Sequence, residues 1–332
     1  MFKTRICEML SIEHPIIQAG MGGVAMGELT AAVSNAGALG VIGAAMLTAD
    51  QLREQIEKVK SLTDKPFGVD LLLAEGAPGV EEALQVMYDE KVPVFVSGLG
   101  NPGPLAAEMH RRGMKIVALV GNVRNARRCA EADVDIIVAQ GHEAGGHTGR
   151  VATLALVPQV VDAVSPIPVL AAGGIADGRG LVASLALGAE GVLVGTRFIA
   201  TDEASSHINY KQRLVTMSDD DTVVSRAYTG KTCRVIRNLY TEEWRDREGE
   251  AKPFPLQVTV AGEHIIGAML HGEMERGFAP AGQISGAIRD ITPAGEVVRA
   301  IIREAEEVLR SLATQHLGAG VPGGQRGAAG GQ

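Results

Sequence analysis

Few cysteines and no long runs of one charge are present in this chain. Its three cysteines, Cys7, Cys129 and Cys233, form no CxxC pair, so the sequence fits a reducing cytosol better than a disulfide framework. Acidic and basic residues are interspersed and give a formal net charge of −8. This balance argues against nucleic acid or an anionic membrane as the main partner.

Long apolar segments are also missing. No apolar run approaches the ~20 residues of a membrane span, and residues 1–8 lack the apolar segment of a signal peptide. These absences predict a soluble, cytoplasmic protein. With 332 residues and 46% hydrophobic content, the chain can bury a large core, either as two domains or as one α/β barrel.

Short apolar runs recur through the first two-thirds and alternate with helical patterns. The eight runs predicted as strands are 14–19, 39–44, 66–73, 93–98, 115–120, 135–140, 168–173 and 191–197. The predicted helices between them are 29–36, 49–61, 79–90, 104–112, 123–131, 156–164 and 180–187. Eight parallel βα units predict a TIM (β/α)8 barrel. An open, doubly wound sheet is the structural alternative.

The pattern changes after Ala200, where the chain becomes more polar and helical. We predict a smaller, mainly helical lid domain at 206–277, inserted after the eighth strand. The barrel would then comprise 1–205 and 278–316, with a helix at 294–313 returning to cover it. The tail, 317–332, holds seven glycines and almost no large apolar groups, and it is predicted to be disordered.

The segment 140–149, Gln-Gly-His-Glu-Ala-Gly-Gly-His-Thr-Gly, directly follows the sixth predicted strand. Its glycines allow the backbone to approach a flat or phosphorylated ligand closely. His147 follows two of them at the catalytic end of a strand and is predicted to contact substrate or transfer a proton. His142 is expected to pack under the loop. Because the two histidines do not form an HExxH motif, a zinc site is not predicted.

Two further glycine-containing turns follow the seventh and eighth predicted strands, at 171–178 and 193–197. In TIM barrels, turns at these positions commonly bind a phosphate. The backbone N–H groups of Gly174, Gly195 and Thr196 would point at it. The alternative is a pair of tight turns without a ligand. The ends of the first strand, at 18–23, and of the third, at 66–70, should lie at the same end of the barrel.

Three of these segments together resemble the nitronate monooxygenase (2-nitropropane dioxygenase) family: 140–147, 171–178 and 195–198. The flavin-dependent enoyl-ACP reductases of bacterial fatty-acid synthesis share the motifs. The likeness extends from about residue 6 to residue 312 and includes 15–21 and 61–69. The motif set is specific for the superfamily and separates its members poorly.

The resemblance implies an FMN-containing TIM barrel with a smaller helical domain over the flavin, and it makes His147 the catalytic histidine. In that family the turns hold the phosphate, the sixth-strand loop contacts the ribityl chain or ring, and the first-strand loop lies beside the ring. The positions that it assigns to the cofactor are Gln18, Ala19, Gly20, Met21, Gly22, Asp70, Gln140, Gly145, Gly146, Gly173, Gly174, Leu193, Val194, Gly195 and Thr196.

Asp70 departs from the family pattern, because many relatives have asparagine there. Asparagine both donates and accepts hydrogen bonds, whereas an ionised aspartate only accepts. A carboxylate beside the flavin would disfavour its anionic reduced form and lower the reduction potential. Alternatively, the carboxyl group is protonated or is turned toward a cation.

Three functions remain open from the sequence. The first is a nitronate monooxygenase, which oxidises alkyl nitronates with O₂ to carbonyl compounds and nitrite, with a protonated His147 binding the nitro group or a neutral one removing a proton. The second is an FMN-dependent reductase of enoyl thioesters or quinones that uses NAD(P)H as co-substrate. The third is a non-enzymatic barrel that binds a phosphorylated ligand. The partner is expected to be a small-molecule substrate, and the sequence leaves open whether the chain forms a homodimer.

Overall fold

A computed structural model describes residues 2–73 and 79–317 of the chain. The tail that the sequence predicts to be disordered lies outside the described residues from position 318 onward. None of the helices in the described part is long and apolar enough to cross a membrane.

Eight parallel strands follow one another around a single sheet. They are β1 (Ile16–Gln18), β2 (Gly40–Gly43), β3 (Phe67–Leu73), β4 (Val94–Gly100), β5 (Lys115–Val120), β6 (Ile136–Gln140), β8 (Val169–Ala172) and β9 (Val192–Val194). β9 pairs with β1, and Leu39, which precedes β2, exchanges backbone hydrogen bonds with Ile16 and Gln18 of β1. The strands therefore surround a common axis in chain order. This arrangement confirms the predicted TIM barrel and excludes the open sheet.

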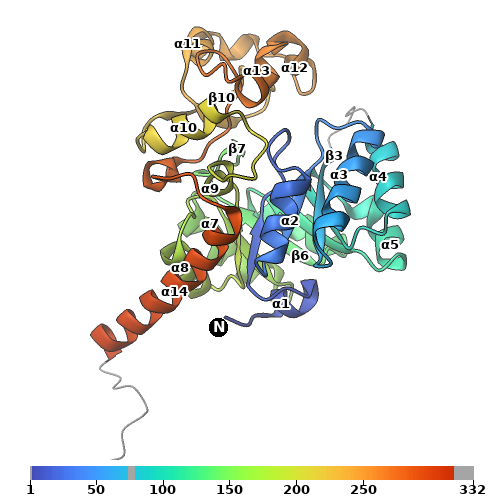
Figure 1. Cartoon of the computed structure of the whole chain (residues 1–332), viewed down its shortest axis with the longest axis vertical. Coiled ribbons are helices and arrows are strands. Elements are labelled where there is room, and N and C mark those ends of the chain that lie inside the picture. Colours follow the sequence, from blue (N-terminus) through green and yellow to red (C-terminus); the bar gives the residue numbers. More distant parts are fainter. Residues whose placement is uncertain (1, 74–78, 318–332) are drawn as a thin grey trace, which may run out of the picture.

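The predicted helices form the outer layer of the barrel. They are α2 (Gly27–Asn35), α3 (Ala49–Leu62), α4 (Val80–Asp89), α5 (Gly103–Arg111), α6 (Val123–Glu131), α7 (Thr153–Val164) and α8 (Gly178–Ala186). The final helix, α14 (Ala294–Leu317), runs along α8 and α2 (Figure 1). Its buried side chains Ala294, Val298, Ile301 and Ala305 recur three to four residues apart, which is why this segment lies against the barrel.

A short helix that the sequence analysis did not predict, α1 (Arg5–Leu10), closes one end of the barrel. Its Ile6 and Leu10 belong to the same apolar cluster as the inward-facing side chains of the strands, such as Val96, Val138 and Leu170. Ile6, Val96, Val138 and Leu170 are fully buried. The barrel interior is therefore a filled core, and its open end lies at the opposite, carboxyl side of the strands.

The segment predicted as a lid contains more than helices. It includes α10 (Ile208–Thr216), α11 (Leu239–Glu243), the 3-10 helix η1 (Arg245–Glu250), α12 (Leu256–Ala261) and α13 (His264–His271). It also contains an antiparallel hairpin of β10 (Thr222–Ser225) and β11 (Cys233–Ile236). These elements gather beyond the barrel (Figure 1). The short helix α9 (Thr196–Ile199) precedes this unit, and the 3-10 helix η2 (Gln283–Ala287) follows it.

One strand of this hairpin also pairs with a segment from the barrel. β7 (Gly146–His147), from the loop after β6, pairs antiparallel with β11, so that His147 lies opposite Cys233 and Gly146 opposite Arg234. The glycine-rich loop and the hairpin thus form one three-stranded sheet. The predicted catalytic histidine is consequently held by a strand from the lid.

Candidate active site

A cavity of about 720 Å³ lies between the carboxyl ends of the barrel strands and the lid elements. This volume is within the usual range for sites that bind cofactors and small ligands. The strand-end residues predicted from the sequence that line it are Ala19, Gly20, Met21, Gly22, Asp70, Gln140, Gly145, Gly146, His147, Gly173, Gly174, Leu193, Gly195 and Thr196. Segments distant in the sequence therefore meet at one site.

Two other predicted residues, Gln18 and Val194, do not line the cavity. The amide group of Gln18 is fully buried in the barrel, where its oxygen accepts from the backbone N–H of Val41 at 3.0 Å and its nitrogen donates to the Val41 carbonyl at 3.2 Å. Val194 is 1% exposed and packs in the core between strands and helices. Both side chains support the wall behind the cavity.

One part of the cavity wall presents free backbone donors. The N–H groups of Gly174 and Gly195 donate to no protein acceptor within residues 2–73 and 79–317, and Thr196 is the first residue of α9, so its N–H has no partner inside that helix. Gly174 has a φ of 73°, a left-handed conformation that glycine adopts at little cost. Uncharged backbone donors of this kind suit a phosphate group.

The loop after β6 is fixed by hydrogen bonds from several directions. The carboxylate of Glu143 accepts from the backbone N–H of Thr153 at 3.0 and 3.1 Å and from its hydroxyl at 3.2 Å. His142 lies within hydrogen-bond distance of the Gly149 carbonyl, 2.8 Å from its Nδ1. Gln140 donates through Nε2 to the His147 carbonyl at 2.6 Å. These bonds hold the backbone of His147 in place beside the cavity.

Two lid residues lie beside the imidazole of His147, and a third pairs with its backbone. Nε2 lies 3.0 Å from the hydroxyl of Thr229, the ring of Phe254 stands edge-on at 6.1 Å, and Cys233 is the opposite residue in the strand pair. Enclosure by the protein, together with the positive charge of Lys231, lowers the pKa of His147 to about 4. At neutral pH the ring is therefore uncharged, so an electrostatic role as an imidazolium is not favoured.

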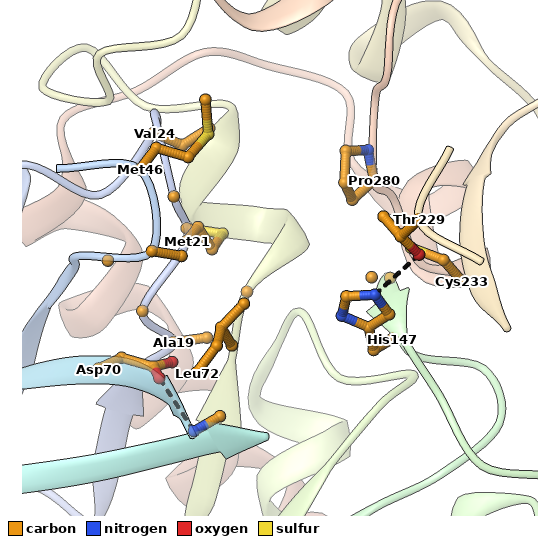
Figure 2. A pocket seen from close by; sticks show the side chains of 18 of the residues that line it. Ala19, Met21, Val24, Met46, Asp70, Leu72, His147, Thr229, Cys233 and Pro280 are labelled. Atoms are coloured by element: carbon orange, nitrogen blue, oxygen red, sulfur yellow. Dashed lines mark hydrogen bonds between the residues drawn. The ribbon is translucent and has the colours of Figure 1, made fainter. Parts of the chain in front are cut away.

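Asp70 lies across the cavity from His147 (Figure 2). Its Oδ1 accepts a hydrogen bond from the backbone N–H of Gly98 at 2.9 Å. A Cβ atom at Gly20 would lie 2.2 Å from the Cβ of Asp70, so this close approach requires glycine. The side chain is 7% exposed, and no Lys, Arg or His of the described residues forms an ion pair with it.

Burial raises the pKa of the Asp70 carboxyl group well above its usual range, and the Gly98 N–H opposes this shift only in part. The sequence left three states open for this residue, ionised, protonated or turned toward a cation, and no cationic side chain of the described residues pairs with it. The protonated state is the one that the surroundings favour. A protonated carboxyl group both donates and accepts, as an asparagine amide does.

The lid contributes cavity residues that the sequence analysis did not single out. They include Tyr210, Thr229, Cys233, Phe254, Leu256, Ile265 and Met269. Thr229 lies between the two strands of the lid hairpin, β10 and β11. Nothing local in that segment reveals that a side chain 82 residues from His147 lies beside it. The polar or titratable lid residues in the cavity wall are Tyr210, Thr229, Cys233 and Thr259, and the other lid residues there are apolar.

Comparison with known proteins gives a consistent result along the chain. The family model described as nitronate monooxygenase matches residues 3–304. A probable nitronate monooxygenase of Staphylococcus aureus is 34% identical over 352 residues, covering 93% of this chain and 99% of the relative. A (3aS,4S,5R,7aS)-5-hydroxy-7a-methyl-1-oxo-octahydro-1H-indene-4-carboxyl-CoA dehydrogenase of Mycobacterium tuberculosis is 33% identical over 342 residues, covering 91% of this chain and 96% of the relative.

The structure resembles that of FabK from Thermotoga maritima, with a TM-score of 0.88 and 39% sequence identity. The match covers 95% of this chain and 99% of FabK. The similarity therefore includes both the barrel and the lid.

Proposed function

The chain belongs to the nitronate monooxygenase family, and on this premise we propose that it is an FMN-dependent oxidoreductase that oxidises alkyl nitronates with O₂ to carbonyl compounds and nitrite. Membership makes it an oxidoreductase. The observation that carries the proposal is a single cavity that has free N–H groups for a phosphate, at Gly174, Gly195 and Thr196, and a neutral imidazole at His147. Its partner would be a small molecule, because the cavity is of that size.

FMN, when bound, would accept electrons from the substrate and pass them to O₂. The residues of this chain would bind, orient and enclose the reactants. The N–H donors would hold the phosphate, and Ala19, Gly20, Met21 and Asp70 would form the wall along the flavin. His147 would form a hydrogen bond with the substrate from the opposite side of the cavity. The apolar lid residues, including Phe254 and Met269, would exclude water.

A neutral His147 is compatible with a nitronate substrate. A nitronate already lacks the α-proton and carries the negative charge, so the enzyme needs to position its oxygens and does not need to remove a proton. The desolvation that keeps His147 neutral also strengthens each hydrogen bond formed in the cavity.

A second candidate is an NAD(P)H-dependent FMN reductase of enoyl thioesters or quinones. It is favoured by the similarity to a protein named as a carboxyl-CoA dehydrogenase, which by its name acts on a CoA ester, and by the largely apolar lid side of the cavity. In that reaction His147 would bind the thioester carbonyl in place of a nitronate oxygen. The same residues would thus serve either substrate. The two reactions differ in the electron donor, a nitronate or NAD(P)H, and in the acceptor, O₂ or the enoyl thioester or quinone.

An anaerobic titration of the FMN-loaded protein separates the candidates. Propionate 3-nitronate, NADH and NADPH are added to separate samples while the flavin absorbance is recorded. Loss of the oxidised flavin band with the nitronate and none with either nicotinamide supports the monooxygenase. The reverse pattern supports the reductase, and a protein that takes up no FMN contradicts both. A His147→Ala variant provides the control, because it should bind FMN and respond weakly to substrate.

A further inference from the structure

The contact between Thr229 and His147 joins the lid to the predicted catalytic group. Thr229 lies in the turn between β10 and β11 and is 5% exposed. Its Oγ1 is 3.0 Å from His147 Nε2, and no other hydrogen bond to either ring nitrogen is formed within the described part of the chain. In Figure 2 the second ring nitrogen, Nδ1, faces the cavity. In a neutral ring, the hydrogen bond at Nε2 therefore determines whether the nitrogen that faces a substrate, Nδ1, carries the proton.

The direction of this hydrogen bond depends on which ring nitrogen of His147 carries the proton. A hydroxyl group has one proton to donate and two lone pairs with which to accept. One lone pair receives the backbone N–H of Lys231 at 3.4 Å, a group that can only donate. The hydroxyl proton then has two acceptors within reach, His147 Nε2 at 3.0 Å and the Lys231 carbonyl at 3.4 Å. With Nε2 unprotonated, the hydroxyl group donates to it, because the nearer acceptor forms the stronger bond.

An Nε2 that accepts a hydrogen bond belongs to a neutral imidazole whose proton is on Nδ1. The charged and titratable groups around the ring come from three elements. Lys231 lies in the same turn as Thr229, Cys233 lies opposite on β11, and Tyr210 extends from α10. The positive charge of Lys231 and enclosure by the protein both disfavour the imidazolium form.

Building on the proposed function, we propose that Thr229 is a positioning residue that keeps the proton of His147 on Nδ1, so that His147 presents an N–H donor to the substrate. This tautomer suits a substrate with an acceptor oxygen at the reacting end, such as a nitronate or a thioester carbonyl. It does not suit removal of a proton from a neutral nitroalkane, because the nitrogen that faces the cavity has no free lone pair. The lid hairpin thereby selects the chemical role of a residue on the barrel loop.

Long-range ¹H–¹⁵N NMR of FMN-loaded protein with ¹⁵N-labelled histidine tests the proposal, because the two nitrogen shifts report which atom carries the proton. A His147→Ala spectrum assigns the signals. We compare wild type with Thr229→Ser, which keeps the hydroxyl group, and Thr229→Val, which keeps the shape and removes it. At pH 7, wild type and the serine variant should show a protonated Nδ1, whereas the valine variant should shift toward Nε2 protonation.

A wild-type proton on Nε2 would overturn the proposal, and so would a valine variant with the wild-type tautomer. Should the valine variant not fold, the wild-type and serine spectra still show which ring nitrogen carries the proton. Kinetics give a second readout: Thr229→Val should lower kcat about tenfold, as expected for one lost hydrogen bond, with KM nearly unchanged and Thr229→Ser restoring the rate. The NMR result does not depend on turnover, so a wrong substrate leaves it intact.

Discussion

Replacing Asp70 by asparagine should make the stability of the protein respond differently to pH. Asparagine keeps the size of the side chain and can still accept from the Gly98 N–H. In wild type, burial raises the pKa of Asp70 in the folded state well above its ordinary value of 3.8. The folded protein therefore holds this proton more tightly than the unfolded chain does. Its contribution to stability is complete below about pH 4 and is lost as the pH rises through the folded-state pKa.

The size of the effect follows from proton linkage. While the pH lies between the unfolded and folded pKa values, the folded state binds about one more proton at Asp70 than the unfolded state. The free energy of unfolding then falls by about 1.4 kcal/mol for each pH unit, a factor of ten in the unfolding equilibrium. Asp70→Asn removes this slope. Relative to wild type, the variant should gain about 1.4 kcal/mol from pH 5 to pH 6 if the folded pKa lies above that interval.

Urea unfolding of the FMN-free protein between pH 4.5 and pH 8 measures this difference. Comparison of the two proteins at each pH cancels the other titrating groups, provided that their environments are unchanged. The difference in unfolding free energy should increase with pH and level off at the folded pKa of Asp70. Asp64→Asn, at an exposed position, is the matched control for removing one carboxyl group. A difference that is constant from pH 5 upward would refute a raised pKa for Asp70.

Other predictions concern the site and its turns. His147→Ala should retain FMN and lose about 100-fold or more in turnover; an unchanged rate would remove its catalytic role. Because the pKa of His147 is about 4, kcat should show no His147-dependent inflection between pH 5.5 and pH 8, and one that disappears in His147→Ala would contradict this. Gly174→Ala places a side chain at a φ of 73° and should cost about 1–2 kcal/mol in urea unfolding; full stability would contradict the assigned turn.

The barrel could be predicted because each of its elements is encoded locally. A run such as 136–139 is apolar throughout, since a parallel strand covered by helices is buried on both faces. The glycine-rich turns could also be recognised locally. A residue whose backbone has a left-handed conformation, or against which another side chain packs closely, has to be glycine. Gly20 and Gly174 are two examples. In a parallel barrel, the residues that follow the strands all lie at one end, so the fold class alone predicts that they form one site.

Elements that depend on distant partners could not be predicted in this way. β7 has two residues, too few for a periodic pattern, and it becomes a strand only because β11 lies beside it. Helix α1 has six residues, and its role in closing the barrel depends on the space between the strands. The lid hairpin lies in a polar stretch that favours a helical interpretation. In each case, contacts with segments distant in the sequence determine the secondary structure and override the local propensity.

The pairing of β7 with β11 changes what the lid can be expected to do. A lid that only covered the cavity would influence substrate affinity and leave the catalytic group to the barrel. Here His147 is bonded to Thr229, lies edge-on to Phe254 and pairs with Cys233. A change in the lid that moves the hairpin also moves the imidazole, so substrate choice and catalytic rate are coupled through the same three residues. Variation of the lid that moves the hairpin should therefore alter kcat together with KM among relatives, unlike the single Thr229→Val replacement.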